Sequence, residues 1–239
     1  MAVTVRQVAG NPGVIINSSS VILGSPTVTG DFVVFVMGRT TTGAGTPSNG
    51  LTDTYGNSWT LVDSLLQDDF VSSWWIAAYV CAGGSTGSSH QFTFTDGNSR
   101  GFTFGIVAYE LDGAKVGGFL GDSDTQTGNT VGIFTDSLVW ASPDNLALGA
   151  AVAPAVSQTW TPASGWTVGY EWESGISTQP TFASIYKIGV AGNTTVEWTG
   201  SNVSGWSAIG LLVKEQGATP TPSLVPNLFP RIPRTSLTR

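Results

Sequence analysis

Short apolar segments separated by turn residues recur along residues 1–215, and they constrain the fold more than any other feature. The clearest segments are 31–38 (DFVVFVMG), 72–81, 91–95 and 206–213. Asp-Gly, Gly-Asn and Gly-Gly pairs, which favour tight turns, lie between such segments. No stretch keeps a helical period of 3.6 residues beyond two turns, although 61–71 could hold one helical turn. Further strand candidates are 14–16, 21–23, 57–63, 102–111, 138–140, 146–152, 166–172, 182–190 and 194–198.

The composition agrees with an all-β protein. Charged residues make up only 10% of the chain, while 31 glycines and many Ser, Thr and Asn residues fill the spaces between apolar runs. This combination is typical of sandwiches and barrels with many turns. No internal repeat of fixed period and no clear linker is evident. We therefore predict one domain over residues 1–215, an antiparallel sandwich of two sheets, followed by a separate C-terminal segment, 216–239.

This C-terminal segment differs sharply from the rest in charge. It contains three arginines, five prolines and no acidic residue, whereas residues 1–215 hold six Lys and Arg against sixteen Asp and Glu, so the net charges are about +3 and −10. The prolines prevent a helix, and the apolar residues are too few for a core. The segment is either a disordered end or an extended arm that binds another surface. The predicted partner-binding residues of the arm are Leu224, Leu228, Phe229, Arg231, Ile232, Arg234 and Arg239.

Charge and cysteine content argue against several classes of protein. A net charge of −7 with scattered basic residues does not suit nucleic-acid binding, which requires clustered Lys and Arg. The single cysteine, Cys81, permits neither an internal disulfide nor a cysteine-rich zinc site. The N-terminus lacks the pattern of a secretory signal, and no apolar run is long enough for a membrane span. We expect no metal and no cofactor.

Candidate catalytic residues are few, and we expect no enzyme. His90 is the only histidine and lies in a Gly/Ser-rich loop, without a G-x-S-x-G motif for a nucleophilic serine. Glu171 and Glu173 would share one face of a strand, as the paired carboxylates of a glycoside hydrolase do, but solvent-facing acids are commoner. The acidic stretch 122–129 offers oxygen ligands for calcium without the spacing of an EF-hand, and a polar turn is the simpler interpretation.

Three tryptophans provide a candidate glycan-binding site. Trp160, Trp166 and Trp172 lie in a region rich in Gly, Ser and Thr. Flat aromatic rings beside polar side chains can bind the faces of sugar rings. The alternative is that these rings point inward or cover the bases of loops.

Two polar positions have predicted structural roles. Asp53 and the Gly56-Asn57 pair can form a tight turn that places Trp59 in the core. Glu110 lies in an apolar strand, and we expect it either on the solvent face or capping a turn, with pairing inside the protein as the alternative.

Several segments together resemble a known family. GDFVVFVMGRT (30–40), LTDTYGNSWTLVD (51–63), the aromatic segment 73–95 and FGIVAYELDGA (104–114) follow one another in this order. The order resembles a jelly-roll-like β-sandwich module found in virion proteins of tailed bacteriophages. The later segments 146–152, 164–172 and 205–213 continue the resemblance, which spans most of residues 1–215.

This resemblance implies a role in the virion. We expect a capsid decoration (cement) protein, made in the host cytoplasm, whose sandwich lies on the outer head surface. Its arm would bind the major capsid protein, and a homo-oligomer such as a trimer would strengthen attachment. The alternative is a tail-associated or fibre-like protein that binds a host glycan or receptor through the tryptophans.

Overall fold

The computed structural model describes residues 2–12, 17–40, 46–47, 50–68, 73–98, 101–114, 120–128, 132–135, 137–153, 159–173, 180–201 and 205–215. Every regular element in these ranges is a β-strand, and all strand pairs are antiparallel. The predicted all-β, antiparallel class is thereby confirmed. Among these residues there is no helix with the length and apolarity needed to cross a membrane. The predicted arm, 216–239, lies outside the described residues.

The strands divide into two sets of eight along the chain. The first half (residues 2–114) contains β1 (Thr4–Asn11), β2 (Ser18–Ile22), β3 (Asp31–Thr40), β4 (Leu51–Asp53), β5 (Thr60–Asp68), β6 (Ser73–Cys81), β7 (Gln91–Thr95) and β8 (Thr103–Asp112). The second half (residues 120–215) contains β9 (Leu120–Gly128), β10 (Gly132–Phe134), β11 (Leu138–Ala153), β12 (Trp160–Pro162), β13 (Thr167–Trp172), β14 (Thr181–Thr194), β15 (Glu197–Gly200) and β16 (Trp206–Val213).

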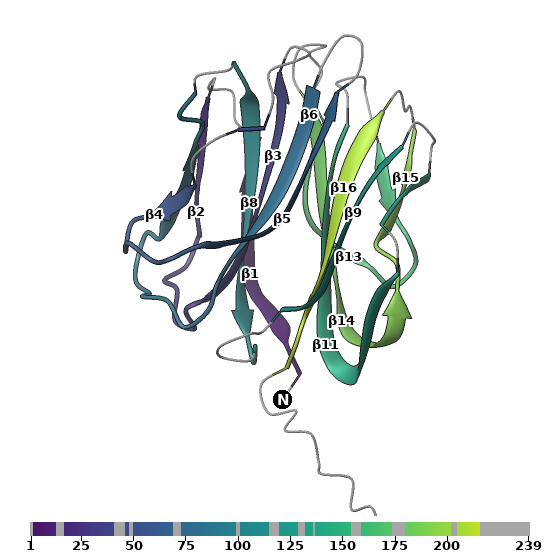
Figure 1. Ribbon diagram of the computed structural model, residues 1–239. Helices are drawn as coiled ribbons and strands as arrows, with labels where there is room; N and C mark the ends of the chain where they lie inside the picture. Colours follow the sequence, from purple (N-terminus) through teal and green to yellow (C-terminus); the bar gives the residue numbers. More distant parts are fainter. Residues whose placement is uncertain are drawn as a thin grey trace, which may run out of the picture.

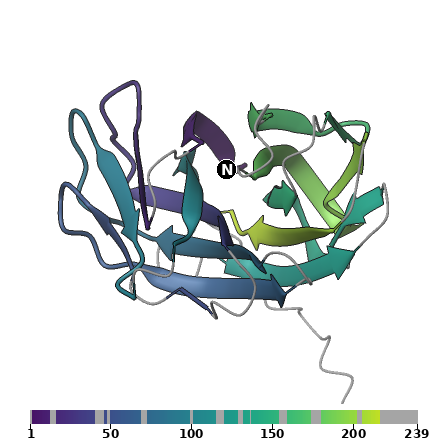
Figure 2. The same cartoon turned by 90° about the horizontal axis from the view of Figure 1, so that it is seen from above.

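These strands form four sheets, not the two predicted. The first half contributes a five-stranded sheet, β1-β8-β3-β6-β5, and a three-stranded sheet, β2-β7-β4. The second half contributes β9-β16-β11-β14-β13 and β10-β15-β12. The five-stranded sheets lie at the centre and a three-stranded sheet covers the outer face of each (Figure 1). Figure 2 shows the two halves side by side from above.

The order of the strands in the first half is therefore repeated in the second half. Adding eight to each strand number of the first half reproduces both sheets of the second half. The halves meet with β1 against β13 and β5 against β9, which is the pattern of an approximate two-fold axis between them. No repeat of fixed period appears in the sequence because the loops differ in length. The connection from β2 to β3 runs from Leu23 to Gly30, whereas the matching one from β10 to β11 has three residues, 135–137.

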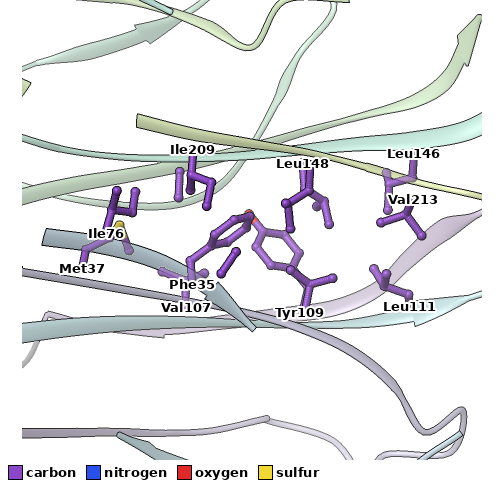
Figure 3. Close-up of a cluster of buried hydrophobic side chains, with 14 of the residues drawn as sticks. Phe35, Met37, Ile76, Val107, Tyr109, Leu111, Leu146, Leu148, Ile209 and Val213 are labelled. Atoms are coloured by element: carbon purple, nitrogen blue, oxygen red, sulfur yellow. The ribbon is translucent and has the colours of Figure 1, made fainter. Parts of the chain in front are cut away.

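A central core lies between the two five-stranded sheets and contains side chains from both halves. Phe35 and Tyr109 of the first half face Leu148 and Ile209 of the second, and all four are fully buried (Figure 3). The hydroxyl of Tyr109 donates a hydrogen bond of 2.7 Å to Ser184 Oγ across this interface. Burial raises the pKa of Tyr109, so the phenol stays protonated.

Two further cores fill the space between each five-stranded sheet and its outer sheet. The first outer core includes Phe32, Trp75 and Phe94. The second outer core includes Trp160, Trp198 and Trp206. A central strand such as β3 is therefore buried on both faces, which explains why its sequence is apolar throughout and does not alternate.

Some elements differ from the sequence expectations. Residues 61–68, where a helical turn was possible, belong to strand β5. The two candidates at 138–140 and 146–152 are parts of one long strand, β11, with irregular pairing between Trp140 and Leu146. The segment 14–16 lies outside the described residues.

Candidate functional site

The three tryptophans of the predicted glycan site do not form one exposed platform. Trp160 is only 3% exposed and packs against Trp198 in the second outer core, with ring centroids 6.4 Å apart. Trp172 is half-buried and stacks on Phe182 at 5.5 Å. Trp166 is also half-buried, and Lys187 Nζ lies 6.0 Å from its ring, the outer limit of a cation–π contact. Trp160 thus offers no ring face to a ligand.

Trp166 has a structural counterpart in the first half. Trp59 and Trp166 each follow a turn that contains a glycine with positive φ, +69° at Gly56 and +84° at Gly165. Each ring packs against the outer core of its own half. The predicted turn at Asp53 is confirmed, because Asp53 accepts hydrogen bonds from the amide of Tyr55 and from Trp59 Nε1. Covering the outer core is therefore a property of the repeat at both positions.

His90 lies in a loop, as predicted, and is fully buried. Its ring stacks on Phe92 with centroids 4.4 Å apart and meets Tyr55 edge-on at 4.7 Å. Nδ1 lies 2.9 Å from Thr27 Oγ1, and Nε2 lies 3.6 Å from Asp53 Oδ1, too far for a hydrogen bond. Burial lowers the pKa of His90, although the charge of Asp53 opposes this change. A neutral, enclosed imidazole of this kind has no access to a substrate.

Glu110 is also fully buried, so its expected position on the solvent face is wrong, while the expected capping role is confirmed. Its Oε1 accepts hydrogen bonds from the backbone amides of Val28 (2.6 Å) and Thr29 (3.0 Å). Its Oε2 accepts one from Gln7 Nε2 at 2.6 Å and lies 3.5 Å from Arg6 Nε. Burial would raise the pKa of Glu110, but these hydrogen bonds together hold it below its usual value.

Polar side chains from several elements make hydrogen bonds to the loop between β2 and β3, residues 23–30. Gln7 binds both the amide and the carbonyl of Ser25, and the Thr27 hydroxyl accepts a hydrogen bond from the amide of Gly87. The carbonyl of Gly30, whose φ is +74°, accepts a hydrogen bond from the amide of Gly84. A Cβ at Gly30 would collide with the backbone of Gly84. Val28, by contrast, is 57% exposed.

The second half shows that the repeat does not require the polar cluster formed by Gln7, Thr27, His90 and Glu110. The amide of Leu23 binds the carbonyl of His90, and the amide of Thr135 binds that of Val196 in the same place, so Val196 corresponds to His90. Glu110 pairs with Phe32, which contacts His90, and Gly210 pairs with Gly149, which lies against Val196, so Gly210 corresponds to Glu110. Both counterparts are buried, and neither has a polar side chain. The polar cluster and its long loop are therefore specific to the first half.

The acidic candidates are explained by local structure. Glu171 accepts a hydrogen bond from the amide of Trp160 at 3.2 Å, and burial raises its pKa. Glu173 is exposed beyond the end of β13, so the strand geometry predicted for the pair does not extend to it. Asp122 lies in β9 and not in a loop, and it accepts hydrogen bonds from the amides of Ser123 and Val139. Within the described ranges no cluster of three or more His, Cys, Asp or Glu residues is placed to hold a metal ion.

Comparison of this chain with protein-family models, with curated proteins and with solved structures found no match. Several residues of the buried cluster were missed by sequence reasoning. Gln7 and Thr27 are ordinary polar residues far from Glu110 and His90 in the sequence, and they gave no local signal. The position of Glu110 within an apolar run gave pairing inside the protein only as an alternative to the solvent face.

Proposed function

We propose that this chain is a non-enzymatic structural protein of a bacteriophage virion, most specifically a capsid decoration protein attached by its C-terminal arm. The observation that carries the proposal is the pair of sandwiches fused through their larger sheets. In each half, strands one, eight, three and six lie in one sheet and strands two, seven and four in the other. This order resembles that of an eight-stranded jelly roll, except that the fifth strand lies in the larger sheet. It supports the virion resemblance found in the sequence.

Two further features support a structural role. The only histidine is enclosed by aromatic rings, so it cannot act as a general base on a bound substrate. The body of about −10 and the arm of about +3 differ in charge, which gives the arm electrostatic attraction to acidic protein surfaces. In this proposal the major capsid protein supplies such a surface, and the body projects outward as a homo-oligomer.

Deleting residues 216–239 should strongly reduce attachment to particles. We expect occupancy on particles from the source host to fall at least about tenfold, because the arm distributes its contacts along a long path. Quantitative mass spectrometry of purified particles measures the copy number of wild type and variant. Hundreds of copies per particle would indicate the head, whereas a handful would indicate the tail.

A matched pair of variants separates charge from shape in the arm. Replacing Arg231, Arg234 and Arg239 with lysine keeps the charge and should keep most of the binding, whereas replacing them with glutamine should weaken it and reduce its dependence on salt. If the chain that lacks residues 216–239 still attaches at full occupancy, the arm does not attach the protein to the particle.

The alternative proposal is a tail-associated glycan-binding protein that uses the partly exposed Trp166. We expect no specific sugar to bind the wild-type protein on a glycan array. A specific sugar that is lost with Trp166→Ala and retained with Trp59→Ala would favour the alternative. Trp59→Ala is the matched control because it removes the corresponding ring of the first half.

A further inference from the structure

An open groove lies where β5 and β6 of the first half meet the start of β9. Its volume is about 510 Å³, and the described residues that line it carry no charged side chain: Ser58, Thr60, Leu61, Val62, Val80, Cys81, Ala82 and Leu120. Val62, Val80 and Leu120 also pack against the central core, so the groove is an opening at the edge of that core. Leu61 at its rim is 49% exposed. The groove is large enough for several apolar side chains.

The chain leaves the folded body beside this groove. Leu120, in the groove wall, pairs with Val213 at the end of β16. Glu215 then forms a bridge with Ala114, and the C-terminal segment begins at the next residue. Leu224 is nine residues beyond Glu215, a length that can span about 30 Å when extended. The first apolar residues of the segment can therefore reach the groove of their own chain.

The chemistry of residues 224–229 matches the groove. The sequence LVPNLF provides two apolar pairs, Leu224-Val225 and Leu228-Phe229, separated by Pro226 and Asn227. It carries no charge, as the lining does not, and proline reduces the entropy lost when an extended segment binds. The arginines follow only after Pro230, outside this uncharged stretch.

We propose that residues 224–229 dock into the groove between β5 and β9 of their own chain, so that the free protein holds its arm against its body. A short tether gives the segment a millimolar effective concentration at the groove, which favours its own chain over a second copy. The docked segment covers the open edge of the central core. This extends the proposed function by giving the arm a binding site in the unattached protein.

Thiol labelling at the groove rim tests the proposal in the free, full-length chain. Leu61→Cys in a Cys81→Ala background provides one reactive thiol at the rim. Replacing Leu224, Val225, Leu228 and Phe229 with serine should increase its labelling rate at least about fivefold, because the docked segment would otherwise shield it. Ile22→Cys in the same background is the matched control, since Ile22 is 51% exposed on β2 in the outer sheet. Its rate should be the same with either tail.

The dependence of the labelling rate on protein concentration distinguishes docking within one chain from docking between copies. Docking within one chain predicts a labelling rate at position 61 that does not change over a tenfold range of concentration. Equal rates with both tails would overturn the proposal, and so would protection that increases with concentration, which indicates docking between copies. The experiment contains no particles, so its result is independent of whether the arm binds a capsid.

Discussion

Replacing Glu110 with alanine should destabilise the protein by about 3 kcal/mol. The change removes the acceptor for the amides of Val28 and Thr29, and a hydrogen bond to a charged group contributes about 1.5–3 kcal/mol. Glu110→Gln retains a carbonyl oxygen in the same place and should cost less, about 1–2 kcal/mol. Chemical denaturation measures both losses, and hydrogen exchange at Val28 and Thr29 shows whether the loop has opened. Continued protection of these amides in Glu110→Ala would contradict the capping role.

The pH dependence of stability provides a second measurement at this site. Because the pKa of Glu110 is lowered on folding, its ionised form stabilises the protein at pH values above the usual 4.5, and this contribution is lost as the pH falls through the lower folded pKa. The difference in stability between wild type and Glu110→Gln should therefore be constant near neutral pH and shrink in acid. A difference that stays constant down to pH about 3 would show that Glu110 is not the titrating group.

Replacing Phe35 with alanine should destabilise the whole molecule and not only the first half. Phe35 is fully buried in the central core, opposite side chains of the second half. Phenylalanine to alanine changes in such positions cost about 3–5 kcal/mol. For a chain of this length we expect the melting temperature to fall by roughly 10 °C. Calorimetry measures this change.

Hydrogen exchange shows whether the two halves respond together. Amides of β6 in the first half and β14 in the second should lose protection to the same extent in Phe35→Ala, because both sheets close on one core. Ile188→Ala is the control, since Ile188 is 47% exposed and its change should cost less than about 1 kcal/mol. Faster exchange confined to β6 would mean that the halves are stable independently.

The strands predicted correctly from the sequence are mainly those of the inner sheets. Segments such as 31–38 and 206–213 are apolar throughout because both faces of an inner sheet are covered. Strands β1 and β9, at sheet edges, were missed because they are rich in polar residues and only partly buried, so neither periodicity nor hydropathy distinguishes them from loops. The short strands β4, β10 and β12 have three residues each, too few for any period.

The repeat and the buried polar cluster depend on contacts between distant residues. Matching strands such as β3 and β11 share an inner position but little sequence, since valine and phenylalanine in one are replaced by alanine and leucine in the other. The loop at 23–30 resembles an ordinary Gly/Ser/Thr connection in sequence, but two of its amides donate hydrogen bonds to Glu110, more than eighty residues away. Turn chemistry was predictable at Asp53 because its partners lie within six residues.

The approximate two-fold relation between the halves has a consequence for how the molecule could diversify. A symmetric dimer of identical sandwiches must carry every substitution twice, once in each subunit. Covalent joining removes this restriction, so one sandwich can have Val196 and Gly210 at positions where its twin has an imidazole and a carboxylate. The repeated scaffold thus allows one half to have a different surface loop while the other half keeps its packing.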